Sequence, residues 1–253
     1  ASWSQVLPGF VVSWGAITDV LSSVSSAAIQ VSYDQGSTYS TLVSNATIGG
    51  SSYNHTLADN KRGTVIQYRV YAIDSLGNES TSSWRIVTAK PKGTFYVSAT
   101  QTVTWETAGT ASWRTDTDDV VSGRVDATYE TQYGYWFYGS TGVSGVCKGY
   151  APDSGTIYMI RQGSLGYTGY NNIALHNHGT KPTTASYDSS TEDQGPYLSG
   201  TDASATYALP SSWLTKFGNG TAKGVVAVDS GSYRRLQGLS STVQSGKLTL
   251  VFN

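Results

Sequence analysis

The chain has 253 residues, which is enough for one large domain or two ordinary domains with a sizeable core. Charged residues make up 13% of the chain, and its formal net charge is −1. The sequence has no run of Lys or Arg. This argues against a nucleic-acid partner, because phosphate neutralisation needs clustered cations. No apolar run reaches about 18 residues, so the sequence predicts no membrane insertion.

The composition favours an all-β protein. The 28 glycines, the 18 tyrosines and the abundant Ser and Thr indicate many short strands and tight turns. The single cysteine, Cys147, excludes an internal disulfide. No signal peptide is present, and because the chain starts at Ala1 we expect a processed or shortened product.

The first part of the chain, residues 1–90, has the pattern of an immunoglobulin-like sandwich. Its apolar segments recur about every ten residues and are separated by polar turns. The predicted strands are 10–14, 28–33, 38–43, 53–57, 65–74 and 83–88.

This part also resembles fibronectin type III modules. The residues that carry the resemblance are Trp14, Tyr33 and the later series Gly63-Thr64, Tyr68-Arg69-Val70-Tyr71-Ala72, Asp74, Gly77-Asn78 and Ser80. The resemblance implies a fibronectin III-type fold that serves as a spacer. The following sequence Ala89-Lys90-Pro91-Lys92-Gly93 is short and polar, which predicts a boundary between a spacer domain at 1–90 and a second domain at 94–253.

The second domain has longer predicted strands and little helix. Residues 94–105 alternate as one strand, with Phe95, Val97, Ala99, Val103 and Trp105 on one face. Further strands are predicted at 156–161, 172–178, 205–209, 223–228 and 246–252, and a short helix with a serine start at 210–218. This pattern fits a jelly-roll-like β-sandwich.

The most aromatic strand runs from Gln132 to Gly139. Its alternation predicts that Tyr135 and Phe137 face one side and that Trp136 and Tyr138 face the other. A strand with large aromatic residues on both faces is expected in the middle of a sheet, with one face in the core and the other covered or used for binding.

The second domain resembles a module that recurs near the C-termini of tail and adhesion proteins of bacteriophages that infect Gram-positive hosts. The motifs that carry the resemblance are Ala111-Ser112-Trp113-Arg114-Thr115-Asp116, Asp118-Asp119-Val120, Trp136-Phe137-Tyr138-Gly139, Ile173, Leu175-His176, His178, Lys181-Pro182, Leu209-Pro210, Gly220-Thr221-Ala222-Lys223-Gly224, Leu236 and Gly238-Leu239-Ser240-Ser241. It implies a jelly-roll-like head that attaches a virion or tail fibre to host surface glycans. The expected location is therefore the virion, with host glycan and other virion proteins as partners and a homo-oligomer as a further option.

The candidate glycan-binding residues lie mainly in a glycine-rich loop at 162–172. Sugar rings stack their C–H faces on aromatic side chains, and loop tyrosines provide contact area at low entropic cost. The predicted contacts are Tyr167, Tyr170, Asn171 and Asn172, together with Tyr133. The alternative is that the loop tyrosines fold back and cover a sheet edge.

Two groups of residues have ligands that metals use. Asp116, Asp118 and Asp119 offer carboxylates to Ca²⁺, but they lack the glycine and glutamate spacing of an EF-hand loop. We expect an acidic turn with Arg114 nearby, and therefore neither a metal nor another cofactor. His176 and His178 have no evident third ligand for zinc.

No pattern points to catalysis. A glycosidase needs two carboxylates beside a cleft, and nothing marks Glu106 or Glu130 for that role. A Gly-x-Ser-x-Gly motif is absent, and Cys147 has no evident histidine partner. The sequence therefore predicts a non-enzymatic phage adhesin that binds a cell-surface polysaccharide. The alternatives are a structural virion decoration protein and a carbohydrate-binding appendage of a secreted bacterial glycosidase.

Overall fold

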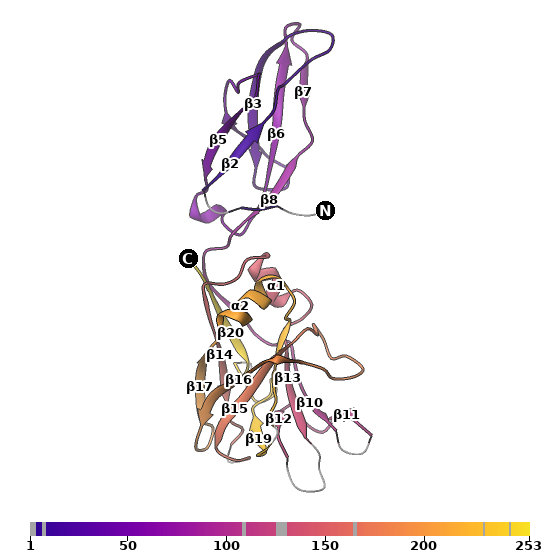
Figure 1. The fold of residues 1–253 in the computed structure, drawn as a ribbon, viewed down its shortest axis with the longest axis vertical. Helices are drawn as coiled ribbons and strands as arrows, with labels where there is room; N and C mark the ends of the chain where they lie inside the picture. The colour runs from indigo at the N-terminus through magenta and orange to yellow at the C-terminus, as the bar shows by residue number, and fades with distance from the viewer. Residues whose placement is uncertain are drawn as a thin grey trace. The chain divides into compact units, whose positions relative to one another are not determined.

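The computed structural model describes residues 4–6, 9–107, 110–124, 131–163, 166–229, 231–242 and 244–253. The chain divides into two compact units, Ala1–Lys92 and Gly93–Asn253, and each is described by itself (Figure 1). Strands dominate both units, which confirms the predicted all-β fold class. In the part of the chain described, no helix has the length and apolar character needed to cross a membrane.

Unit 1 is an immunoglobulin-like sandwich of two sheets. One sheet has the order β1 (Ser4–Val6), β8 (Arg85–Ala89), β6 (Val65–Asp74), β3 (Val24–Ser32) and β4 (Ser40–Val43), with β7 (Glu79–Thr81) paired to β6. The other sheet pairs β2 (Gly9–Trp14) with β5 (Ser51–Thr56), and a 3₁₀ turn, η1, covers Asp59–Lys61.

The core of unit 1 contains a buried polar pair. The ring of Phe10 meets that of Tyr68 edge-on, with centroids 5.8 Å apart. The Tyr68 hydroxyl lies 2.8 Å from Nδ1 of His55 and satisfies that buried ring. Val31, Leu57 and Ile66 complete this core. The short strands β1 and β7 were not predicted.

Unit 2 is a jelly-roll-like sandwich. Its first sheet, called the aromatic sheet below, has the order β11 (Ser112–Trp113), β10 (Gln101–Glu106), β13 (Gln132–Phe137), β18 (Gly224–Ala227), β15 (Gly169–His176) and β16 (Asp188–Leu198). The second sheet, called the facing sheet, has the order β17 (Ser204–Ala208), β14 (Ser154–Ile160), β20 (Lys247–Phe252) and β9 (Gly93–Val97). A small ribbon pairs β12 (Val120–Ser122) with β19 (Arg234–Leu236).

The main core of unit 2 lies between these two sheets. Trp136 of β13 is fully buried there, and its ring leaves only 2.1 Å to the position of a β-carbon on Gly246. Tyr138 is also in this core, whereas Tyr135 and Phe137 point to the opposite face, as the alternation predicts. The hydroxyl of Tyr138 donates to the Gly246 carbonyl at 2.6 Å.

Two helices lie together at one end of unit 2 (Figure 1). The helix α2 (Ser211–Gly218) buries Trp213 and Phe217 at the predicted positions. The helix starts at Ser211, as predicted, but Pro210 occupies the N-cap position and no side chain caps the helix. The other helix, α1 (Gly142–Cys147), was not predicted.

The prediction of one strand at 94–105 is wrong. The chain forms β9 in the facing sheet and β10 in the aromatic sheet, and it crosses between them at 98–100. As a result Val97 packs in the main core, while Val103 and Trp105 pack on the opposite face of the aromatic sheet. The physical reason is that small Ser, Ala and Thr residues turn this corner without interrupting the alternation of the sequence.

Candidate functional site

The outward face of the aromatic sheet carries a cluster of rings that is mostly covered. Tyr135 and Phe137 stack with centroids 5.7 Å apart, and Trp113 meets the ring of Tyr135 edge-on at 5.2 Å. The indole of Trp113 donates to the Pro182 carbonyl at 2.7 Å, and Tyr187 packs against the same cluster. The segment that contains these two residues therefore makes the cluster a small second core and removes it from the surface.

Exposed rings remain at the free edge of this sheet, on β15 and β16. Tyr170 and Tyr197 are paired across these strands, and their rings meet edge-on with centroids 5.1 Å apart. They are 49% and 52% exposed, although both belong to paired strands. Large apolar rings exposed as a pair do little for the core, and such groups are typical of contact surfaces.

Amide side chains lie next to this pair on the same face. Asn172 is two residues after Tyr170 and opposite Gln194 on β16. Asn172 is partly buried and Gln194 is exposed. We call Tyr170, Asn172, Gln194 and Tyr197 the tyrosine patch. It combines ring faces with amide donors and acceptors, which is the chemistry that binds a sugar.

The predicted contact Tyr133 lies further along the same face. The backbone N–H of Val228 donates to the Asn172 carbonyl at 2.9 Å, so β18 separates Tyr133 on β13 from Asn172 on β15. Tyr133 is partly buried, and its ring lies 5.5 Å from that of Tyr187. It borders the patch across β18 and does not belong to it.

Two arginines hold the loop that leads to the patch. Arg161 is buried and donates to the carbonyls of Gly166 and Gly200 at 2.5 and 2.6 Å. Arg234 donates to the Tyr170 carbonyl at 3.2 Å. These contacts fix the backbone on both sides of Tyr167, whose side chain is 65% exposed. The patch is therefore presented on a well-anchored backbone.

The prediction of Asn171 as a glycan contact needs correction. Its side chain is only 2% exposed, and its amide donates to the carbonyls of Gly169 and Pro196 at 3.3 and 3.1 Å. Alternation explains this, because Tyr170 and Asn172 face outward and Asn171 between them must face inward. Its amide satisfies two backbone carbonyls beside an irregular pairing of β15 with β16.

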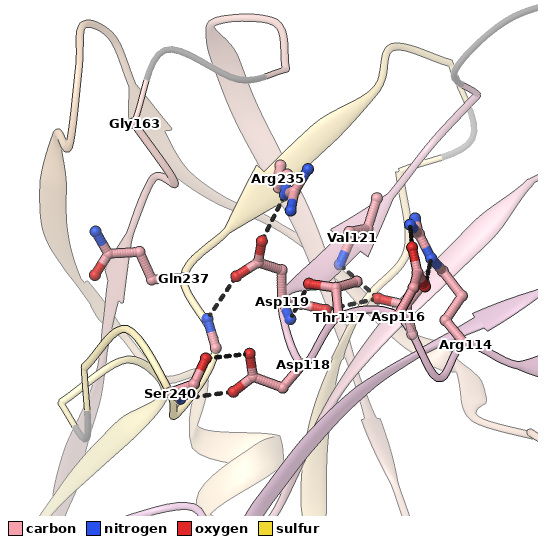
Figure 2. Close-up of polar contacts among 12 residues, drawn as sticks. Arg114, Asp116, Thr117, Asp118, Asp119, Val121, Gly163, Arg235, Gln237 and Ser240 are labelled. Carbon is pink, nitrogen blue, oxygen red and sulfur yellow. Dashed lines mark hydrogen bonds and ion pairs between the residues drawn. The ribbon is translucent and has the colours of Figure 1, made fainter.

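The acidic segment is engaged within the protein (Figure 2). Asp116 pairs with Arg114 at 2.6 Å, and this hydrogen bond lowers the pKa of its carboxyl group. Asp118 accepts from the backbone N–H and the hydroxyl of Ser240 at 2.6 and 2.5 Å. Asp119 is buried and pairs with Arg235 at 2.5 Å.

Asp118 and Asp119 therefore connect the segment before β12 to the segment around β19, whereas Asp116 pairs within its own segment, and the three carboxylates do not converge on one point. Within the described residues, no group of His, Cys, Asp and Glu side chains has an arrangement that could hold a metal ion. The expectation that no Ca²⁺ is bound stays a prediction, and Asp116, Asp118 and Asp119 are the weak candidate ligands if one is.

The two histidines have a structural arrangement. Nε2 of His176 lies 3.1 Å from the Trp136 carbonyl, and its Nδ1 accepts the backbone N–H of His178 at 3.3 Å. Burial lowers the pKa of His176 to about 3, so its imidazole is neutral at ordinary pH.

The two glutamates considered for catalysis are Glu106 and Glu130. The carboxyl group of Glu106 accepts a hydrogen bond from the side chain of Gln132 at 3.1 Å, and Glu130 lies outside the described residues.

Sequence reasoning missed Tyr197 and Gln194, because β16 is polar and was not predicted as a strand. The one useful signal is Pro196, since proline within a strand is confined mainly to sheet edges. An exposed tyrosine next to such a proline is a reasonable candidate for a contact residue at an edge.

Comparison with known proteins gives little further guidance. No protein-family model matches the chain, and no curated protein matches it. A solved structure, described as the structural basis for the promiscuous specificity of carbohydrate-binding modules from the β-sandwich superfamily, is similar at a TM-score of 0.20 and 11% identity. The match covers 95% of this chain and 94% of that chain. At this TM-score the likeness carries no argument.

Proposed function

We propose that residues 93–253 form a non-enzymatic module that binds a neutral polysaccharide through the tyrosine patch. The observation that carries the proposal is the Tyr170–Tyr197 pair, which is about half exposed on paired strands and flanked by Asn172 and Gln194. The rings offer stacking faces to sugar C–H groups, and the amides offer both donors and acceptors to hydroxyls.

The expected ligand is neutral because of the charge of the chain. Its formal net charge is −1, and the two arginines of β19 pair with carboxylates: Arg234 with Asp229 at 3.5 Å, and Arg235 with Asp119 at 2.5 Å. A strongly acidic polymer would need free cations that attract it. Each patch would bind weakly, so useful attachment requires many copies on one particle.

We propose the surface of a bacteriophage virion as the setting, with the fibronectin III-like unit as a spacer. The motif resemblances in both units support this setting, and a host cell-wall glycan is then the ligand. A purely structural role in the virion predicts no retention on cells, whereas a glycosidase appendage predicts a catalytic domain in the same polypeptide.

The test uses the full chain with a fluorescent tag, offered to intact Gram-positive cells and to the same cells after removal of their wall polysaccharide. The proposal predicts retention on intact cells and loss of retention on stripped cells. Equal retention on both would exclude the polysaccharide as the ligand, and retention on neither, across a panel of strains, would favour the structural role.

A further inference from the structure

A hollow of about 200 Å³ lies at the other end of β15 from the tyrosine patch, between the start of β16 and the region of α2. Its walls come from three parts of the chain. They include His176 at the end of β15 with Asn177 after it, Asp188 at the start of β16 with Tyr187 before it, and Lys216 of α2. Most of these side chains are polar.

The charged groups in the wall form a pair. The ammonium of Lys216 donates to the carboxylate of Asp188 at 2.5 Å, and this hydrogen bond lowers the pKa of the Asp188 carboxyl group. The two side chains are 35% and 39% exposed. A pair this exposed contributes little to stability, so the fold alone does not explain why it lies in a hollow.

The wall has capacity left for a ligand. An ammonium group has three donors, and among the described contacts Lys216 uses one of them on Asp188. Asn177 is exposed, and its amide adds two donors and an acceptor. The hydroxyl of Thr221 donates to Asn219 at 2.7 Å and keeps its own acceptor capacity. The opposite charges of Lys216 and Asp188 cancel, which suits a neutral ligand.

We propose that this hollow is a second sugar subsite, which takes one neutral sugar residue of the polysaccharide that the tyrosine patch binds. Lys216 would donate to one hydroxyl, Asp188 would accept from its neighbour, and Tyr187 would cover the ring. The six residue steps from Tyr170 to His176 span about 20 Å of strand, so a chain of several sugars is needed to reach both sites. This inference rests on the proposed function.

The ring of Tyr187 connects the two sites. It faces the hollow, lies 5.5 Å from the ring of Tyr133, and donates its hydroxyl to Glu192 at 3.0 Å. A sugar chain that leaves the patch therefore meets tyrosine rings and polar groups along its path to the hollow.

The experiment measures the affinity of the full-length parent and of three variants for wall polysaccharide purified from a strain that retains the tagged protein. The variants are Lys216→Ala, Asn177→Ala and the double variant Tyr170→Ala/Tyr197→Ala. Asn177 is exposed, so its variant is expected to fold even if Lys216→Ala does not. Tyr96→Ala, on β9 and 64% exposed, is the matched control.

The inference predicts that Lys216→Ala and Asn177→Ala each weaken binding roughly three- to tenfold, as expected for lost hydrogen bonds to a ligand. It also predicts that Lys216→Ala no longer changes the affinity for shorter oligosaccharides, whereas the tyrosine variant still lowers it. If both pocket variants bind like the parent while the tyrosine variant loses affinity, the subsite is refuted and the proposed function stands. If only Lys216→Ala and Asn177→Ala lose affinity, the hollow binds the polysaccharide by itself. That result would refute both its role as a second subsite and the proposed binding at the tyrosine patch.

Discussion

The ring of His176 lies over Gly224 on the neighbouring strand, where a β-carbon would come within 2.1 Å of the ring. The same β-carbon would lie 2.5 Å from the Trp136 carbonyl, which His176 contacts at 3.1 Å. This arrangement places a buried neutral imidazole between the strands that carry the aromatic cluster and the tyrosine patch. The histidine therefore contributes to the packing of the aromatic sheet.

The first prediction follows from this packing. Gly224→Ala should destabilise unit 2 by about 1–3 kcal/mol, because the added methyl group collides with the ring and with backbone. Thermal unfolding measures the effect. Gly145→Ala is the control, since its nearest neighbour would be 4.0 Å away, and it should be neutral or slightly stabilising. Equal melting temperatures for Gly224→Ala and the parent would contradict the described packing.

The second prediction concerns acid stability. The pKa of His176 is about 3 in the folded chain and 6.5 in the reference state, so below pH 6.5 the unfolded chain takes up a proton that the folded chain does not. The contribution of neutral His176 to stability is therefore fully present above pH 6.5 and is lost as the pH falls from 6.5 towards 3. At pH 4.5 the loss should be about 2–3 kcal/mol relative to pH 7.5.

Chemical denaturation of the parent and of His176→Gln at both pH values checks this. The variant should be less stable at pH 7.5, but it should lose less stability on acidification because its side chain does not titrate. The same loss in both proteins would show that other groups, including His55 and His178, account for the acid sensitivity, since burial also lowers their pKa values.

The third prediction separates structural carboxylates from metal ligands. Asp119→Asn should cost about 2–4 kcal/mol, because it leaves the partly buried Arg235 without its charge partner. Asp116→Asn, which removes an exposed charge, should cost less than about 1 kcal/mol. Addition of EDTA to the parent should leave its melting temperature unchanged. A clear drop with EDTA would instead assign these carboxylates to a bound cation.

The fourth prediction concerns independence of the two units. A fragment that covers residues 93–253 contains both sheets of unit 2 and its main core. It should therefore be soluble and should unfold in one cooperative transition. Calorimetry of the fragment and of the full chain measures this. A fragment that lacks a cooperative transition while the full chain has one would contradict the boundary.

Alternation predicted the strands with one clear face, but it could not show where the chain changes sheets. The two faces of β13 follow directly from the order of Tyr135, Trp136 and Phe137. At 98–100 the sequence keeps its alternation through a corner, so β9 and β10 were read as one strand. Only the pairing of β9 with β20 and of β10 with β13 reveals the crossing.

The sequence also predicted only part of the candidate site, because one of its two strands has no clear alternation. A glycine-rich loop with Tyr167 and Tyr170 is visible in the sequence, and the structure exposes both rings. Their partner Tyr197 lies on β16, whose Asp, Ser, Gly and Pro residues conceal the strand. Asn171 was wrongly included because the sequence did not show that β15 already begins at Gly169, which makes this residue face inward.

The most direct test of the account compares the attachment of the parent, Tyr170→Ala/Tyr197→Ala and Tyr96→Ala to polysaccharide-bearing cells. Stacking of each ring contributes about 0.5–1.5 kcal/mol, so the double variant should bind roughly tenfold more weakly or worse, with a melting temperature close to that of the parent. Tyr96→Ala removes a more exposed tyrosine outside the patch and should bind like the parent. A double variant that binds as well as the parent, or a control that loses as much, would contradict the assignment of the tyrosine patch as the glycan site.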